Sequence, residues 1–106
     1  MPLVCLITCS SKEEALRIAR ALVHERLAAC VNLIHGLHSI YWWKGAVEEA
    51  EEALLLVKTT RERLPALVDR VRALHAYTVP EVVALSIEGG NPDYLAWLVD
   101  SVAAHS

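Results

Sequence analysis

Three side chains in this sequence, Cys9, His75 and Glu81, carry the donor atoms best suited to a transition metal. A thiolate and an imidazole suit Cu(I), Cu(II) or Zn(II), and a carboxylate can complete such a ligand set. The structural alternative is a cysteine at the end of a strand and a histidine held by hydrogen bonds at the end of a helix. We favour that alternative, but no other ligand set for a soft or borderline ion is visible in the chain.

The remaining histidines and a run of glutamates are weaker candidates. His35 and His38 are three residues apart, which places them on opposite faces of a strand and makes them a poor chelate. His24, on an expected exposed helix face, and His105 have no evident companion. Four glutamates could collect hard cations loosely, but a strand would divide them between two faces, so a solvated or salt-bridged strand is favoured. They are Glu48, Glu49, Glu51 and Glu52.

A second group of residues could line a pocket for a small anion or polar metabolite. Lys58 stands where an apolar run meets the surface, so its ammonium could meet Glu81 and phenol hydroxyls there. We predict that Lys58, Tyr77, Glu81 and Trp97 bind such a ligand at a junction between subunits. The alternative, which we favour for the aromatics, is that they are interface packing, and both can hold. The wider group is Tyr41, Trp43, Lys58, Tyr77, Glu81, Tyr94 and Trp97.

One long β-hairpin, predicted over Cys30 to Thr60 with its turn at Lys44-Gly45, positions most of these residues. Its first arm is rich in β-branched, aliphatic and aromatic residues without a helical repeat, which indicates a strand. The second arm has the apolar spacing of an amphipathic helix. Against that, the continuous apolar run at 54–57 is typical of a strand buried on both faces, and the turn brings it back along its partner. We therefore predict a strand.

The segments around the hairpin predict one strand and one helix on each side of it. Leu3 to Thr8 is an apolar run of strand length, and Ser11 with Glu14 predicts a capping box at the start of a helix that ends near Arg26. After the hairpin, Thr59 and Glu62 predict a second capping box. The helix that follows closes before residue 75, and a strand is expected at residues 82–87.

A last helix is expected to begin with Asn91 as its N-cap and Pro92 in its first turn. Its core side should carry Leu95, Leu98, Val99 and Val102. The order β-α-β-β-α-β with this extra helix predicts an α+β fold: a ferredoxin-like split β-α-β sandwich with a long central β-hairpin, in a single domain over residues 1–106. The hairpin arms exceed what their partner strands need, and Trp42 on an unpaired edge favours closed association with identical chains.

Composition narrows the possible partners. The net charge is −3 without a basic cluster, which argues against nucleic acid. The 55% hydrophobic content is high for a small monomer and favours an oligomer. No segment has the length of a membrane span, and no signal peptide is visible, so we expect a cytoplasmic protein without a membrane partner.

Several short motifs resemble those of the CutA family of divalent-cation tolerance proteins. They are LAACVN at 27–32, SxYWWKG at 39–45, the Lys58-Thr59 pair, HxYxxPE at 75–81 and YLxWL at 94–98. Together they cover nearly the whole chain in order. The resemblance implies a ferredoxin-like subunit, a homotrimer built by pairing long hairpins between subunits, and a link to copper and divalent-cation tolerance.

The resemblance also implies a copper site, attributed in the family to a Cys at the end of the first strand, a His before the Tyr motif, and the Glu of the Pro-Glu pair. Only Glu81 is clearly matched here. Cys9 lies two residues after the position of the family's Cys, Ile7, and His75 lies one residue after that of its His, Leu74. We therefore expect weak divalent-cation binding, with Cu(II) first, and no obligatory cofactor.

The sequence thus predicts a non-enzymatic trimeric protein linked to divalent-cation (copper) tolerance. The alternative is a trimeric signalling or interaction scaffold that binds a small metabolite in the cleft between subunits, by analogy of fold alone. An enzyme is the third choice. Lys58, His75 and Tyr77 could act as acid and base, but no nucleophile elbow, P-loop or cofactor fingerprint accompanies them.

Overall fold

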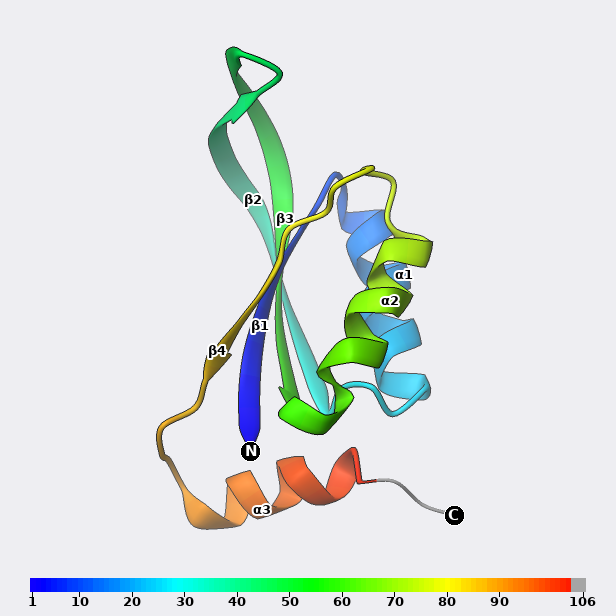
Figure 1. Cartoon of the computed structure of the whole chain (residues 1–106), viewed down its shortest axis with the longest axis vertical. Coiled ribbons are helices and arrows are strands. Elements are labelled where there is room, and N and C mark those ends of the chain that lie inside the picture. Colours follow the sequence, from blue (N-terminus) through cyan, green and yellow to red (C-terminus); the bar gives the residue numbers. More distant parts are fainter. Residues whose placement is uncertain (104–106) are drawn as a thin grey trace.

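A computed structural model describes residues 1–103, and its elements follow the predicted order. The strands form one antiparallel sheet in the order β2-β3-β1-β4, and α1 and α2 lie together on one face of it (Figure 1). The predicted ferredoxin-like α+β architecture is therefore confirmed. His105 lies outside the described residues. The elements are β1 (Pro2–Cys9), α1 (Lys12–His24), β2 (Cys30–Trp43), β3 (Ala46–Thr60), a 3-10 turn (Arg61–Arg63), α2 (Leu64–Leu74), β4 (Val82–Ser86) and α3 (Pro92–Ser101).

The long hairpin turns at Lys44 and Gly45, as predicted. Their φ angles are +49° and +80°, and positive φ at both central residues is what a type I′ turn requires. The twist of that turn matches the twist of paired strands. Pairing continues to the turn itself, where Trp43 lies opposite Ala46, so the second arm is a strand despite its helical spacing.

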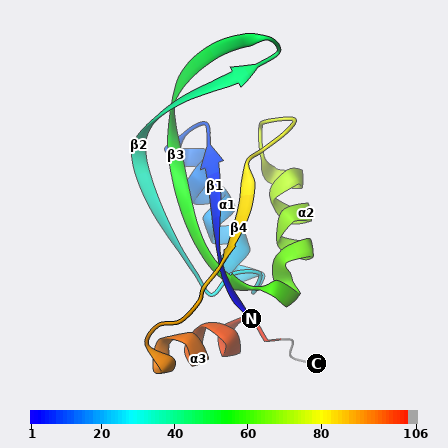
Figure 2. The ribbon, with the colours of Figure 1, turned by 60° about the vertical axis from the view of Figure 1, so that its left-hand side comes forward.

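The hairpin extends beyond the strands beside it. β1 ends with Cys9 opposite Ala53, so within the described chain the outer half of β3, residues 46–52, pairs with β2 alone. A bulge between His35 and Leu37, with Gly36 at a φ of +87°, interrupts β2 where this outer half begins. Figure 2 shows the outer half curling over toward the end of β1.

The two faces of the sheet differ in how they are covered. Alternate residues of β1 and β3 point toward α1 and α2, and Cys5, Ile7 and Leu55 in that layer are fully buried. The opposite face is mostly apolar, apart from Thr8, Asn32 and Lys58, but α1 and α2 do not lie on it, and α3 crosses only the end of the sheet (Figure 1). Ile34, Val83 and Leu85 are about half exposed there, at 49%, 46% and 52%. We call this surface, formed by Val4, Leu6, Ile34, Leu54, Leu56, Val83 and Leu85, the open face.

The helix starts agree only partly with the sequence patterns. The Ser11 hydroxyl accepts a hydrogen bond from the Glu14 N–H, as a cap should, but the Glu14 carboxylate reaches Ser10 rather than Ser11. The second capping box is wrong. Thr59 belongs to β3, and its buried hydroxyl donates to the Leu27 carbonyl at 2.6 Å. A 3-10 turn, not a side-chain cap, leads into α2.

The last helix begins as predicted, with the Asn91 side chain accepting a hydrogen bond from Asp93 N–H. Leu98 and Val102 are buried, but Val99 is 41% exposed, so its predicted core position is wrong. The apolar spacing overestimated the buried face of α3, because the helix presents only a narrow stripe to the end of the sheet. None of the helices in residues 1–103 is long and apolar enough to cross a membrane. The cytoplasmic location stays a prediction.

Gly45→Ala should destabilise the protein by about 1–2 kcal/mol, because an L side chain resists positive φ. A Cβ at this position meets no atom within 4 Å, so the cost would come from the backbone alone. Denaturant unfolding at a fixed protein concentration measures the change. Gly89→Ala is the matched control, since its Cβ also enters open space without a positive φ. Equal effects of the two substitutions would refute the type I′ turn as a source of stability.

Candidate functional site

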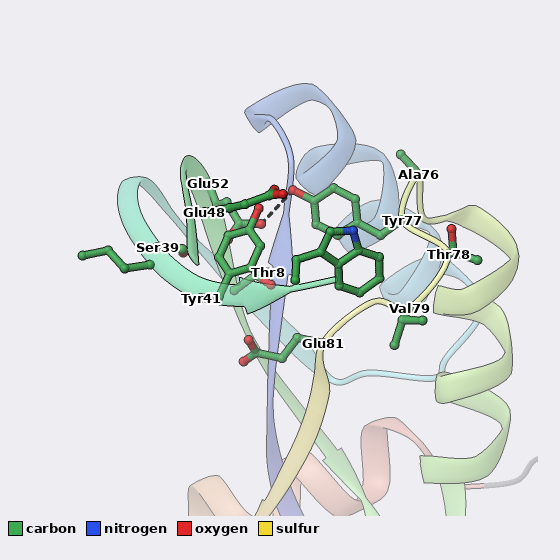
Figure 3. Close-up of a pocket in the computed structure, with 12 residues that line it drawn as sticks. Thr8, Ser39, Tyr41, Glu48, Glu52, Ala76, Tyr77, Thr78, Val79 and Glu81 are labelled. Carbon is green, nitrogen blue, oxygen red and sulfur yellow. Dashed lines mark hydrogen bonds between the residues drawn. The ribbon is translucent and has the colours of Figure 1, made fainter. Parts of the chain in front are cut away.

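The curled hairpin and the segment after α2 line a half-open cavity of about 620 Å³. Figure 3 shows Tyr41 and Glu48 of the hairpin facing Tyr77 of that segment. The Tyr77 hydroxyl donates to Glu52 Oε2 at 2.8 Å. Burial and the hydrogen bond to Glu52 raise the Tyr77 pKa above its ordinary value, so the phenol stays protonated. The lining residues are Thr8, Ser39, Ile40, Tyr41, Trp43, Glu48, Glu52, Ala76, Tyr77, Thr78, Val79 and Glu81.

Two of the four residues predicted to bind a ligand, Tyr77 and Glu81, line this cavity, but Lys58 and Trp97 do not. Lys58 pairs with Val4 near the start of β1, whereas the cavity lies at the other end of that strand, about 13 Å away at the usual rise per residue.

Lys58 and Trp97 are therefore not part of this cavity, and their predicted role at a junction between subunits stays a prediction. The Lys58 ammonium donates instead to the Asn32 side chain, and the Trp97 ring packs on Tyr94 of the same helix with centroids 5.5 Å apart. An apolar run that reaches the surface shows where a lysine emerges, but not which end of the sheet it faces.

The hairpin divides the glutamate run as expected. Glu48 and Glu52 line the cavity, while Glu49 bonds His38 on the hairpin surface, with 2.7 Å between His38 Nε2 and Glu49 Oε1. Both of these side chains are more than half exposed. Adjacent residues of a strand point to opposite faces, so the run cannot act as one cluster.

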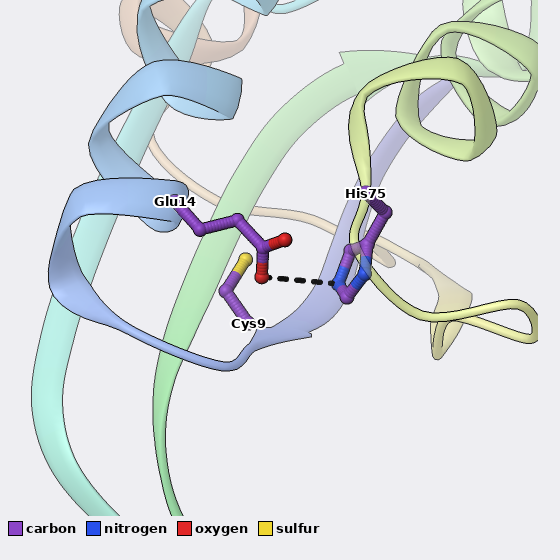
Figure 4. Close-up of side chains that lie close together, drawn as sticks. All are labelled: Cys9, Glu14 and His75. Carbon is purple, nitrogen blue, oxygen red and sulfur yellow. Dashed lines mark ion pairs between the residues drawn. The ribbon is translucent and has the colours of Figure 1, made fainter.

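The structure brings Cys9 and His75 together, but the carboxylate beside them is Glu14 rather than Glu81 (Figure 4). Their potential donor atoms all lie within 4.8 Å of one another, and all three residues are buried. Glu81 is exposed at the cavity wall. Sequence reasoning treated Glu14 only as a helix cap. Its place in the first turn after β1, close to the end of the strand that carries Cys9, was the signal that could have found it.

Both ring nitrogens of His75 are already used. Nε2 lies 2.7 Å from the Thr8 carbonyl oxygen, which can only accept, so Nε2 carries the proton. Nδ1 accepts the Tyr77 N–H at 3.0 Å, so Nδ1 carries none. This network assigns the neutral Nε2–H tautomer. A metal could bind the ring only after one of these bonds breaks.

Glu14 collects hydrogen bonds from two separate segments. Its Oε1 accepts the Ser10 N–H at 2.8 Å and the Ser10 hydroxyl at 3.0 Å, and its Oε2 accepts the Ala76 N–H at 2.7 Å. Burial would raise the pKa of this carboxyl, but these hydrogen bonds outweigh burial and hold the pKa below its ordinary value. Glu14 is thus a buried carboxylate, 4% exposed, with its charge satisfied by the protein.

Cys9 completes this cluster as a neutral thiol. Burial, reinforced by Glu14 and Glu52, raises its pKa to about 12. A thiolate is the form that binds metals, so the thiol opposes coordination near neutral pH. Cys9, Glu14 and His75 therefore do not fit a divalent ion as they are bonded here. They instead join the end of β1, the start of α1 and the segment after α2.

Glu14→Gln should lower the free energy of unfolding at pH 7 by roughly 1–3 kcal/mol, since an amide cannot accept all three hydrogen bonds. The folded carboxyl has a pKa below its ordinary value of 4.5, so its contribution is complete well above pH 4.5 and is lost as the pH falls through the folded value. The difference between wild type and variant should therefore shrink in acid, as followed by denaturant unfolding across pH. Glu13→Gln, on the exposed side of the same turn, should change stability by less than about 0.5 kcal/mol. A gap that widens in acid would contradict this assignment.

Comparison with known proteins places the fold and the motifs in one family. The family described as CutA1 divalent ion tolerance protein matches residues 3–101. The chain is 62% identical to the divalent-cation tolerance protein CutA of Thermus thermophilus over 95 residues, 90% of this chain and 92% of that protein. It is 52% identical to mouse protein CutA over 92 residues, 87% of this chain but 52% of that longer protein.

Solved structures agree with these sequence matches. The Thermus thermophilus divalent cation tolerance protein superposes with a TM-score of 0.95 at 58% identity, covering 97% of this chain and 100% of that one. Rice CutA1 gives 0.94 at 45% identity, covering 98% and 95%. The match over nearly the whole chain, in sequence and in structure, means that this chain belongs to the CutA1 divalent ion tolerance protein family.

Proposed function

We propose that the protein is a non-enzymatic homotrimer with a role in divalent-cation tolerance. Family membership supports the link to divalent cations. The observation that best supports a trimer is the open face, an apolar sheet surface without a helix layer. An exposed apolar surface of this kind is typical of one that another chain covers.

Unpaired strand edges support the same assembly. The outer half of β3 lacks a partner on the side that β1 would occupy, and the edge of β2 is free along its length in the described chain. Trp42 is 75% exposed and Ile40 66% exposed on this hairpin. Pairing these edges with identical chains would satisfy their backbone groups and cover the apolar side chains.

Of the three residues considered as an acid and base, His75 and Tyr77 lie together, with ring centroids 4.8 Å apart, but none of the three is placed to act as one, which supports a non-enzymatic role. Lys58 bonds Asn32 at the far end of β1 from the cavity, and His75 is buried with both ring nitrogens bonded. Tyr77 lines the cavity, but its raised pKa makes the phenol a poor proton donor near neutral pH.

Divalent cations would bind this chain weakly, at exposed groups rather than at Cys9 and His75. The His38 imidazole and the Glu49 carboxylate form an exposed nitrogen and oxygen pair on neighbouring strands. Such a pair suits Cu(II) ahead of other divalent ions. No obligatory cofactor enters this proposal.

Leu85→Glu should shift the assembly from three chain masses toward one, because a carboxylate would be buried at the open face. Light scattering at micromolar concentration measures the mass. Val23→Glu is the control, since Val23 is similarly exposed, at 41%, but on helix α1. A wild-type monomer would end the trimer proposal.

His38→Gln should weaken Cu(II) binding in calorimetry by about tenfold, since it removes the only nitrogen of the proposed pair. His24→Gln, on α1, should leave the affinity unchanged, and so should Cys9→Ala. Loss of copper affinity in Cys9→Ala alone would instead favour the buried cluster.

A further inference from the structure

We propose that the cavity between the hairpin and the segment after α2 binds a small organic cation, such as an ammonium compound. This function differs from the assembly and the metal role proposed above, although the outer hairpin that lines the cavity, Ile40 included, also belongs to the surface proposed for assembly. The cavity volume, about 620 Å³, is the size of a site for a small metabolite.

The negative charge of the cavity wall favours a positively charged ligand. Glu48, Glu52 and Glu81 line it, and its described lining includes no lysine, arginine or histidine. Carboxylates concentrated in a concave, partly apolar site raise the local concentration of cations and repel anions. The absence of Lys58 from this wall removes the cationic group that an anionic metabolite would need.

Glu52 gives the strongest indication of a cationic partner. The residue is only 7% exposed, and among the described residues its Oε2 receives one hydrogen bond, from Tyr77, while Oε1 receives none and is still reached by solvent. A buried carboxylate is costly unless an opposite charge or several hydrogen bonds offset the loss of water. Glu14, by comparison, accepts three. A bound cation would supply the charge that the lining of the cavity lacks.

The aromatic residues favour an organic cation over a bare metal ion. Tyr41, Trp43 and Tyr77 line the same cavity, and aromatic rings attract ammonium groups through their negatively charged faces. A divalent metal needs oxygens that converge to about 2.0–2.6 Å from one point. Among residues 1–103, the potential ligands that converge as a group of three or more are Cys9, Glu14 and His75, not the cavity glutamates.

Calorimetry at low salt with three compounds of similar shape tests the sign of the ligand charge. Choline is the cation, 3,3-dimethyl-1-butanol its neutral isostere and 3,3-dimethylbutyrate an anion. The intact assembled protein should bind choline about tenfold or more tightly than either of the others. Equal binding of the neutral isostere overturns the proposal. So does a lack of choline binding at millimolar concentrations, as would follow if a neighbouring copy filled the cavity.

Paired variants locate the binding. Glu52→Gln should raise the dissociation constant of choline by about tenfold, while Glu51→Gln, on the other face of the same strand, should change it less than about twofold. Trp43→Ala should weaken binding by about threefold or more, while Trp42→Ala, outside the cavity, should not. The tryptophan pair decides the question if Glu52→Gln fails to fold. Equal effects within both pairs would place choline elsewhere and overturn the proposal.

Discussion

The position of the segment after α2 depends on one buried carboxylate. Glu14 sits at the start of α1 and accepts hydrogen bonds from Ser10 at the end of β1 and from Ala76 beyond α2. A charge in this position is tolerable only because several donors satisfy it. If those segments separated, the buried carboxylate would lose its hydrogen bonds, which is energetically costly. His75 adds a second tie by donating to the Thr8 carbonyl.

This network also explains how the cavity forms. With Ala76 held by Glu14, the next residue, Tyr77, is directed toward the hairpin, where its hydroxyl meets Glu52. The hairpin reaches that point because its outer half continues past the end of β1 and curls back over it (Figure 2). The donor atoms of Cys9, Glu14 and His75, which resemble a metal site, therefore connect the end of β1, the start of α1 and the segment after α2. The glutamates that line the cavity are a separate group.

Much of the fold could be predicted from the sequence, because turn and cap residues determine the structure of the short segments that contain them. Lys44-Gly45 specifies its turn through backbone preference, and Asn91 with Pro92 specifies the start of α3. The candidate site was harder, because it depends on strand register and side-chain partners. Cys9 and His75 do lie close together, as the predicted ligand set required. Their carboxylate was taken from the motif that carries Glu81, although Glu14 lies nearer along the strand-to-helix connection.

The placement of Lys58 also depends on strand register, which the sequence did not reveal. Its run of apolar neighbours identified a strand end, but only the pairing of β3 with β1 decides that it lies opposite Val4 rather than beside the cavity. The sign of the ligand charge depended on that register. A lysine in the cavity would have favoured an anion, whereas the observed wall favours a cation.

Amide hydrogen exchange at Ala76 and Tyr77 tests most directly whether the buried network holds this segment in place. Their N–H groups donate to Glu14 and His75, so they should exchange much more slowly than the amide of the exposed neighbour Val79. Glu14→Gln should abolish this protection while leaving that of β1 and β3 intact. Fast exchange at Ala76 and Tyr77 in the wild type, equal to that of Val79, would contradict the account.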